Sequence, residues 1–176
     1  MKKKTLWEIA HFEAAHFCEA VESACARVEI AGSLRRMARE VGDIEIVAEP
    51  SWYEEDLFGD LTGNHSLDLF DWSALGELKL NGHKQKKIFL PNGLAVDVFI
   101  VTPPAQWGVQ FLLRTSPADF SHKMVTSKSY GGYKPHYLEM RGGAFYNSFG
   151  VTQKTPEEQD VFNLFGMAYI EPQKRG

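Results

Sequence analysis

An apolar run interrupted by one acid constrains the fold of this chain more than any other feature. Residues 93–101 are Gly-Leu-Ala-Val-Asp-Val-Phe-Ile-Val, and Asp97 is the one charged residue among them. A run of this kind is typical of a strand that lies inside a sheet and is buried on both faces. Burying a lone carboxylate there is costly unless a cation or a polar partner compensates its charge. The run therefore predicts a central strand and a compensating group beside Asp97.

A second pair of acids could share that compensating group. Asp43 and Glu45 alternate with Ile44 and Ile46, so in a strand both carboxylates project from one face. An isolated pair of this spacing is more often two solvated acids, but a third acid on a neighbouring strand changes the interpretation. Hard oxygen ligands suit Mg²⁺ or Mn²⁺. We expect Asp97 to meet the pair across the sheet and the three acids to hold two divalent ions.

The Gly32-Ser33 pair precedes a helix expected over Leu34 to Glu40. Backbone N–H groups at such a turn, together with the positive end of a helix, can hold phosphate oxygens. Arg36 adds a permanently charged fork and is the better candidate for a triphosphate, with Arg39 as a weaker one. Gly-Ser turns are common, and this turn alone would carry little weight.

Together, the acids and the turn describe a reaction. Two metal ions can lower the pKa of an attacking hydroxyl and neutralise charge on a leaving pyrophosphate, in an in-line displacement at the α-phosphorus. That reaction is nucleotidyl transfer. Asp97, expected to be deepest in the sheet, is assigned to the ion that activates the hydroxyl.

Composition limits the chain to a single core or two small lobes. It has 176 residues, 44% of them hydrophobic, and a formal net charge of -4, so its overall field does not indicate a polyanion-binding protein. Cys18 and Cys25 are expected two turns apart on one helix, beyond disulfide reach. No run approaches membrane-spanning length, which leads us to expect a soluble, cytoplasmic protein.

The order of patterns along the chain predicts two units that meet near Pro103. A helix of about twenty residues follows Thr5, whose spacing to Glu8 is that of a capping box. His11 and His16 fall on different faces of that helix and are expected to be solvated or packed rather than metal ligands. The acidic segment Ser51 to Gly76 is expected to be an excursion outside the core.

Strands, turns and helices are expected in the rest of the chain from their local patterns. The strands are Leu78 to Leu80, Lys87 to Leu90 and Leu94 to Val101, with hairpin turns at Asn81-Gly82 and Asn92-Gly93. Two helices follow, over Ala105 to Leu113 and Ala118 to Val125. After them come a hairpin around Arg141-Gly142-Gly143 and a last helix, which starts at Thr155-Pro156-Glu157-Glu158 and ends at Gly166.

Three motifs together resemble the active site of the polymerase beta superfamily of nucleotidyltransferases. They are Gly32-Ser33-Leu34-Arg35-Arg36, Gly42-Asp43-Ile44-Glu45-Ile46-Val47 and Val96-Asp97-Val98-Phe99. A further similarity, to the C-terminal lobe of family X DNA polymerases, lies in Pro103-Pro104-Ala105-Gln106-Trp107-Gly108 and in residues 155–175, including Glu158-Gln159-Asp160-Val161-Phe162 and Tyr169-Ile170-Glu171-Pro172. The resemblance covers most of residues 28–176, and the combination is specific where each motif alone is not.

The resemblance implies an α/β (α+β) fold. Residues 1–103 would form a catalytic palm with a mixed β-sheet and flanking helices, and residues 104–176 a small α+β lobe that selects the nucleotide, like a polymerase beta thumb. The implied activity is that of a DNA polymerase: transfer from a dNTP to a DNA 3′-hydroxyl with two Mg²⁺ ions, or Mn²⁺ in their place, in short-gap filling and repair. A monomer that binds gapped or primer-template DNA weakly is expected.

By position, the resemblance also assigns roles to residues. The metal ligands and catalytic residues are Asp43, Glu45 and Asp97, and the nucleotide-binding residues are Gly32, Ser33, Arg36 and Arg114.

The chain departs from the family pattern in four places. Glu45 stands where aspartate is usual, Leu113 to Pro117 replaces a Tyr-Phe-Thr-Gly-Ser turn that lines the sugar pocket, and Ser121 takes the place of an asparagine that reads the minor groove. Only one helix precedes the Gly-Ser turn, which leaves no room for a lyase domain. DNA contact is therefore expected from lysines in Asn81 to Lys87 and Lys128 to Lys134.

Two alternatives to a gap-filling DNA polymerase stay open. One is a nucleotidyltransferase that modifies RNA, a protein or a small molecule, which the acidic charge and the altered sugar pocket permit. The other, from a different class, is a nucleic-acid-binding relative without catalysis. The trio of acids argues against the second alternative, because uncompensated carboxylates lower stability.

Overall fold

The chain folds into two compact units. The computed structural model describes residues 4–175, and the division falls between Thr102 and Pro103. The fold is mixed α+β, with a mixed sheet in the first unit and a small antiparallel sheet in the second. Each unit has its own hydrophobic core.

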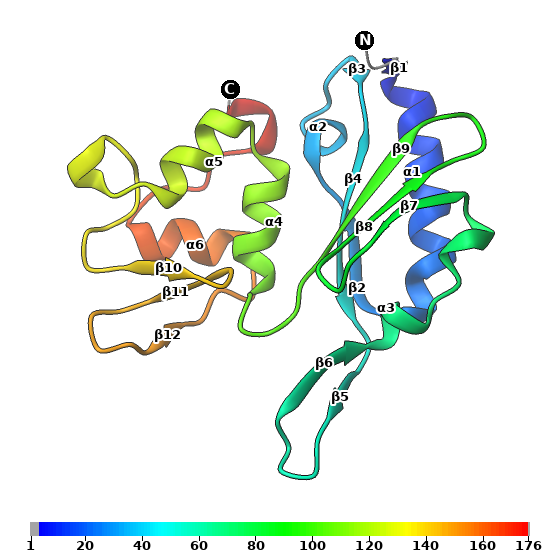
Figure 1. The fold of residues 1–176 in the computed structure, drawn as a ribbon. Helices are drawn as coiled ribbons and strands as arrows, with labels where there is room; N and C mark the ends of the chain where they lie inside the picture. The colour runs from blue at the N-terminus through cyan, green and yellow to red at the C-terminus, as the bar shows by residue number, and fades with distance from the viewer. Residues whose placement is uncertain (1–3, 176) are drawn as a thin grey trace. The chain divides into compact units, whose positions relative to one another are not determined.

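A five-stranded mixed sheet organises the N-terminal unit (Figure 1). Its order is β2-β4-β9-β8-β7, in which β4 and β9 are parallel and the other neighbours antiparallel. The apolar run of residues 93–101 contains the middle strand, as its composition predicts, and Val96 and Val98 are fully buried. The strands are β2 (Cys25–Ile30), β4 (Ile44–Pro50), β7 (Glu77–Asn81), β8 (Gln85–Phe89) and β9 (Ala95–Ile100).

Helix α1 (Trp7–Val21) covers one face of this sheet (Figure 1). Its buried residues recur at helical spacing, and they pack in one cluster with strand residues such as Ile46 and Val98. The opposite face of β4 and β9 carries Glu45 and Asp97, because side chains alternate along a strand. The apolar and acidic faces of the sheet are thus separated by strand periodicity alone.

The start and length of the first helix differ from the prediction. Thr5 does not cap the helix, because Thr5–Leu6 forms the short strand β1, which pairs with β3 (Glu40–Val41), and the residue before the helix is Leu6. The helix has 15 residues, so Cys25 lies in β2 rather than on the same helix as Cys18. Both cysteines are free thiols, and burial raises the pKa of Cys18 to about 12 and that of Cys25 to about 11.

The helix after Gly32 is also shorter than predicted. Helix α2 covers only Gly32–Arg35, because Met37 adopts a left-handed conformation with φ 57°. The Met37 N–H donates to Leu34 O at 2.9 Å, and the Ala38 N–H donates to Ser33 O at 3.0 Å. These two bonds form a Schellman motif, which closes a helix. Glycine usually occupies this position, so a methionine there does not indicate the end of a helix.

Residues 51–76 are part of the core as well as a surface excursion, which corrects the prediction. A hairpin of β5 (Tyr53–Glu55) and β6 (Leu61–His65) projects from the sheet (Figure 1). It is followed by α3 (Ser66–Leu69) and a 3-10 turn, η2 (Trp72–Ala74). Leu67 and Trp72 are buried in the main core, and the Trp72 indole N–H donates to Leu67 O at 2.9 Å.

The two hairpin turns of the structure differ from the predicted turns in position or in length. Between β7 and β8 the closing bond joins Gly82 N to Gln85 O, so the turn residues are His83-Lys84 rather than Asn81-Gly82. Between β8 and β9 three residues separate Leu90 from Leu94, and Gly93 supplies the left-handed position with φ 86°.

The C-terminal unit packs helices on a three-stranded antiparallel sheet of order β10-β11-β12. Helix α5 has the predicted bounds, and Gly142-Gly143 forms the predicted turn with positive φ at both residues. Gly166, with φ 67°, ends α6 as predicted. The elements are α4 (Trp107–Thr115), α5 (Ala118–Val125), η3 (Lys128–Tyr130), β10 (Glu139–Arg141), β11 (Ala144–Tyr146), β12 (Thr152–Gln153), α6 (Glu158–Phe165) and η4 (Pro172–Lys174).

The start of α6 is capped two residues later than predicted. Asp160 accepts a hydrogen bond from the Glu157 N–H at 2.9 Å, so the capping box is Glu157 with Asp160 rather than Thr155 with Glu158. Glu158 instead turns inward and is 4% exposed.

Candidate functional site

The register of the parallel pair brings two of the three predicted acids together. Glu45 on β4 lies directly opposite Asp97 on β9. Ile44 and Ile46 flank Glu45 and point into the core with zero exposure, which leaves Glu45 on the other face. Asp43 immediately precedes β4, two residues before Glu45, and is half-buried. The face not covered by α1 therefore carries an acidic site at the centre of the sheet.

Asp97 is the buried member of this site, with 6% exposure. Its Oδ2 is 2.8 Å from the Lys87 Nζ, and its Oδ1 accepts a hydrogen bond from the Gln85 Nε2 at 3.1 Å. Both partners belong to β8, and Lys87 is the register partner of Asp97. The charge of Asp97 is thus compensated by a lysine of the neighbouring strand.

Lys87 is a site residue that the sequence interpretation missed. Asn92 lies five residues from both Lys87 and Asp97, so a hairpin centred on Asn92 places the two residues opposite each other. The predicted two-residue turn at Asn92-Gly93 would instead pair Lys87 with Val98, so the three-residue loop of the structure is what brings Lys87 and Asp97 together. Opposite charges directly across an antiparallel pair are a normal stabilising arrangement.

The Gly32 turn packs directly on Glu45. A side-chain carbon added to Gly32 would lie 1.9 Å from the Glu45 Oε2, which is closer than any non-bonded contact allows. Gly32 is also in the left-handed region with φ 61°, where other residues are strained. The Ala31 N–H donates to Glu45 O at 2.8 Å. Glycine is therefore required at Gly32 for two reasons, and the turn and the carboxylate have fixed positions relative to each other.

The remaining predicted nucleotide-binding residues lie in different elements. Ser33 is in α2 and Arg36 is its C-cap residue, and both are half-buried. Helix α2 has only four residues, so a long-helix dipole does not operate there, although the first N–H groups of any helix lack intrahelical acceptors. Arg114 is exposed in the last turn of α4, in the C-terminal unit.

Several lysines that were expected to face DNA are occupied within the protein. Lys86 is 1% exposed, and its ammonium donates to Asp68 and Asn81. The Lys134 Nζ donates to Leu138 O, whereas Lys128 stays exposed with its Nζ 3.5 Å from Phe165 O. With Lys87 bound to Asp97, Lys84 is the exposed lysine of the Asn81 to Lys87 stretch. The expected basic surface is therefore smaller than the sequence implied.

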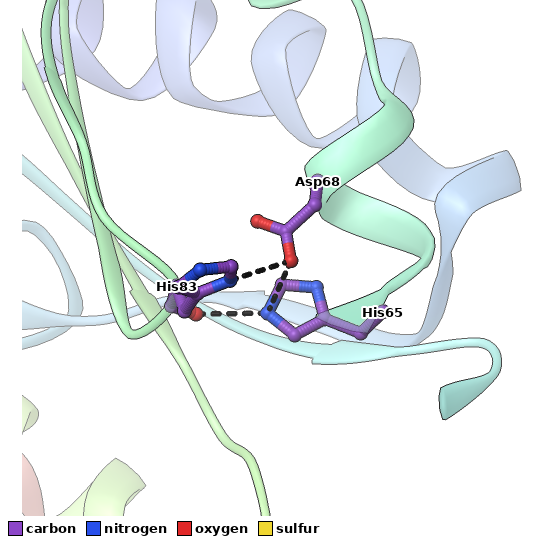
Figure 2. Close-up of side chains that lie close together, drawn as sticks. All are labelled: His65, Asp68 and His83. Atoms are coloured by element: carbon purple, nitrogen blue, oxygen red, sulfur yellow. Dashed lines mark hydrogen bonds and ion pairs between the residues drawn. The ribbon is translucent and has the colours of Figure 1, made fainter. Parts of the chain in front are cut away.

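The tightest group of potential metal ligands in residues 4–175 is a different one. The ligand atoms of His65, Asp68 and His83 all lie within 4.8 Å of one another, and Asp43, Glu45 and Asp97 do not form such a group. Figure 2 shows the three side chains converging from separate elements. His65 ends β6, Asp68 is in α3 and His83 is in the β7–β8 turn.

Hydrogen bonds connect this second cluster. The Asp68 Oδ2 is 2.9 Å from the His83 Nδ1 and 3.5 Å from the His65 Nε2 (Figure 2). Burial by itself would raise the pKa of the Asp68 carboxyl, but hydrogen bonds from Lys86 and His83 and the nearby charges outweigh it and lower that pKa. Asp68 is thus held as a carboxylate. The His65-x-x-Asp68 spacing was visible in the sequence, but its meeting with His83 depends on the tertiary fold.

The chain matches no family model, and it matches no curated protein sequence. Within the described residues, no helix is both long enough and apolar enough to cross a membrane.

Proposed function

We propose that this chain is a nucleotidyltransferase of family X type that adds a nucleotide from a dNTP to a DNA 3′-hydroxyl, with short gaps as its natural substrate. In this proposal residues 1–103 are the catalytic palm and residues 104–176 select the nucleotide. The observation that carries the proposal is the register of β4 and β9. It sets Glu45 opposite Asp97 on the face of the sheet that α1 does not cover, with the Gly32 turn packed against Glu45.

The carboxylates are of the chemical type that the metal ions of this reaction require, although their ligand atoms do not all lie within 4.8 Å of one another. A carboxylate can accept roughly four hydrogen or metal bonds, and each Asp97 oxygen has one bond from β8. Asp43, Glu45 and Asp97 are oxygen donors of the kind that Mg²⁺ and Mn²⁺ prefer. Bound Mg²⁺ would supply activation of the 3′-hydroxyl and stabilisation of the pyrophosphate. Glu45 has a longer arm than aspartate, and its contact with Gly32 fixes where that arm ends.

The protein's own groups would position the reactants. Ser33 and the backbone of the Gly32 turn would hold phosphate oxygens, and the guanidinium of Arg36 would hold the triphosphate, with Arg114 assigned to the nucleotide by the resemblance alone. Lys87 would orient Asp97 by holding one of its two oxygens.

Substitutions at Asp97 and Lys87 test the role of the site. We expect Asp97→Asn to abolish transfer, because an amide is a poor ligand for Mg²⁺, while circular dichroism shows an intact fold. Lys87→Gln should lower transfer by about 10–100-fold without abolishing it, since Lys87 holds a metal-binding carboxylate but does not itself bind the ion. The measurement is extension of labelled gapped DNA, primer-template, RNA and no acceptor with each nucleoside triphosphate and Mg²⁺ or Mn²⁺.

The outcomes separate the alternatives. Extension directed by the template base supports the polymerase, whereas labelling without a template would replace it by a transferase acting on RNA, a protein or a small molecule. If Asp97→Asn keeps near-normal activity, the metal assignment is wrong.

One observation favours a second candidate function. The Lys87 ammonium already compensates the buried Asp97 carboxylate, so the acids do not require a metal ion for stability. A nucleic-acid-binding relative without catalysis is consistent with this pairing. It would bind gapped DNA without turnover on any acceptor, and its Asp97→Asn and Lys87→Gln variants would show no difference in the transfer assay.

A further inference from the structure

We propose that His65, Asp68 and His83 form a zinc-binding site that joins the segment of residues 51–76 to the β7–β8 turn. The site is separate from the acidic site on β4 and β9 and does not depend on the nucleotidyltransferase proposal. Its donors are two imidazole nitrogens and one carboxylate oxygen, a set that favours Zn²⁺ over Mg²⁺ or Ca²⁺.

The spacing of the donor atoms is close to that of a tetrahedral zinc site. With metal–ligand bonds of about 2.0–2.1 Å, neighbouring ligands lie about 3.4 Å apart. The His65 Nε2 and the Asp68 Oδ2 are separated by 3.5 Å, which requires no movement. The His83 Nδ1 is 2.9 Å from the same oxygen and must retreat by about half an ångström. The His83 side chain is 66% exposed on a turn, so that adjustment is easily made.

The position of the His65 ring is fixed before any ion binds. His65 is fully buried at the end of β6, and its Nε2 is 2.8 Å from the backbone oxygen of His83. The carbonyl oxygen of His83 therefore stands next to the three donors and could fill a fourth position, which water could also fill. Metal binding at Nε2 would replace the hydrogen bond to the His83 carbonyl oxygen and move the ring proton to Nδ1, which is buried without a hydrogen-bond partner.

Lys86 holds the Asp68 carboxylate by its other oxygen, Oδ1. Its ammonium donates to the Asp68 Oδ1 at 2.8 Å and to the Asn81 Oδ1 at 2.7 Å, which leaves Oδ2 facing the two histidines. Metal-binding carboxylates are commonly held in this way by a hydrogen bond to the other oxygen. The positive charge of Lys86 disfavours the binding of a metal cation nearby. The alternative to a zinc site is therefore a metal-free network of hydrogen bonds around the buried Lys86.

Zinc titration of the intact protein tests the site. Calorimetry is carried out in millimolar Mg²⁺, which is added to saturate any divalent-cation site at the carboxylates on β4 and β9, and the wild type is compared with three variants. We expect one equivalent of Zn²⁺ to bind the wild type. His83→Gln should weaken binding at least tenfold, and because His83 is exposed, that variant should fold normally. The matched control His16→Gln, an exposed histidine on α1, and Asp97→Asn should bind as the wild type does.

A second measurement locates the ion. In histidine ring NMR spectra, Zn²⁺ should shift the resonances of His65 and His83 and leave those of His16 and His136 unchanged. The proposal is overturned if the wild type binds no Zn²⁺, if His83→Gln binds with wild-type affinity, or if binding is lost in Asp97→Asn but kept in His83→Gln. Any of these results would leave the cluster as a hydrogen-bonded network around Lys86.

Discussion

At the scale of single residues, the acidic site depends on a glycine as much as on its acids. Gly32 allows the backbone to approach the Glu45 carboxylate, and no other residue could do so without moving that carboxylate. Glu45 in turn lies opposite Asp97, which is balanced by Lys87. A side chain added at Gly32 should therefore displace Glu45 and, through it, disturb the surroundings of Asp97.

Gly32→Ala should lower stability. The added carbon meets the Glu45 carboxylate, and the left-handed backbone costs a residue other than glycine about 1–2 kcal/mol. Urea unfolding followed by circular dichroism should show a loss of at least that size. The matched control is Gly42→Ala, where an added carbon meets nothing within 4 Å. Gly42→Ala should be neutral or stabilising by up to about 1 kcal/mol, and equal losses in the two variants would show that Glu45 is not fixed by Gly32.

At the scale of elements, a buried ion pair in the C-terminal unit joins Arg175 to α6. The Arg175 Nη1 is 2.6 Å from the Glu158 Oε1, and both side chains are at most 5% exposed. The Tyr169 hydroxyl donates to the other Glu158 oxygen at 2.8 Å, and the guanidinium lies over the rings of Phe162 and Tyr169. Residues 169–175 are thereby fixed against α6.

Arg175→Met should destabilise the protein by about 3–5 kcal/mol, because it leaves the Glu158 carboxylate buried without its cation. Chemical unfolding followed by tyrosine and tryptophan fluorescence measures the loss. Adding Glu158→Gln to this variant should restore part of it, since the uncompensated charge is then removed. The neighbouring control Lys174→Met, at an exposed position, should change stability by less than about 0.5 kcal/mol. A small effect of Arg175→Met alone would contradict this account.

Elements with a strong local pattern could be predicted from the sequence. Helix α5 and the strands β4 and β9 were placed correctly because their hydrophobic periodicity is clear. The cap on α1 and the length of α2 were wrong because distant or unusual contacts decided them. Thr5 pairs with Val41, and Met37 takes a conformation that usually belongs to glycine.

The candidate sites follow the same division. The meeting of Glu45 with Asp97 was expected from the strand pattern and was found in the register. Lys87 was missed because the predicted two-residue turn is one residue shorter than the loop that sets the register of β8 and β9. The cluster of His65, Asp68 and His83 could not, because its three members lie on separate elements whose packing is set by the core around Leu67 and Trp72.

At the scale of the whole molecule, the chain has two cores with different composition. The N-terminal core is largely aliphatic and packs α1 on the sheet, whereas the C-terminal core is rich in phenylalanine. A domain with its own core can unfold locally while its neighbour stays folded. The two units should therefore respond separately to damage in one core.

Phe162→Ala should expose the C-terminal unit without loosening the N-terminal sheet. Phe162 is fully buried, and its truncation removes about 3–5 kcal/mol of packing. Hydrogen exchange measured by mass spectrometry should speed up across residues 103–175 and stay at wild-type rates in β4 and β9. The reciprocal control is Ile46→Ala, in the other core, which should speed up exchange in the sheet and spare α5 and α6. Faster exchange in both units from either variant would mean that the chain unfolds as one cooperative body.

The place of β9 in the sheet has a consequence for how the chain folds. It is the last of the five strands along the sequence, yet it lies between β4 and β8. During synthesis β4 and β8 therefore emerge first and cannot pair with each other in the native order, because the strand that joins them is still to come. Closing the parallel pair requires a long loop, which makes such pairing slow. The acidic site is thus expected to form late, and the open edges of β4 and β8 are the surfaces on which a newly made chain is most exposed to aggregation.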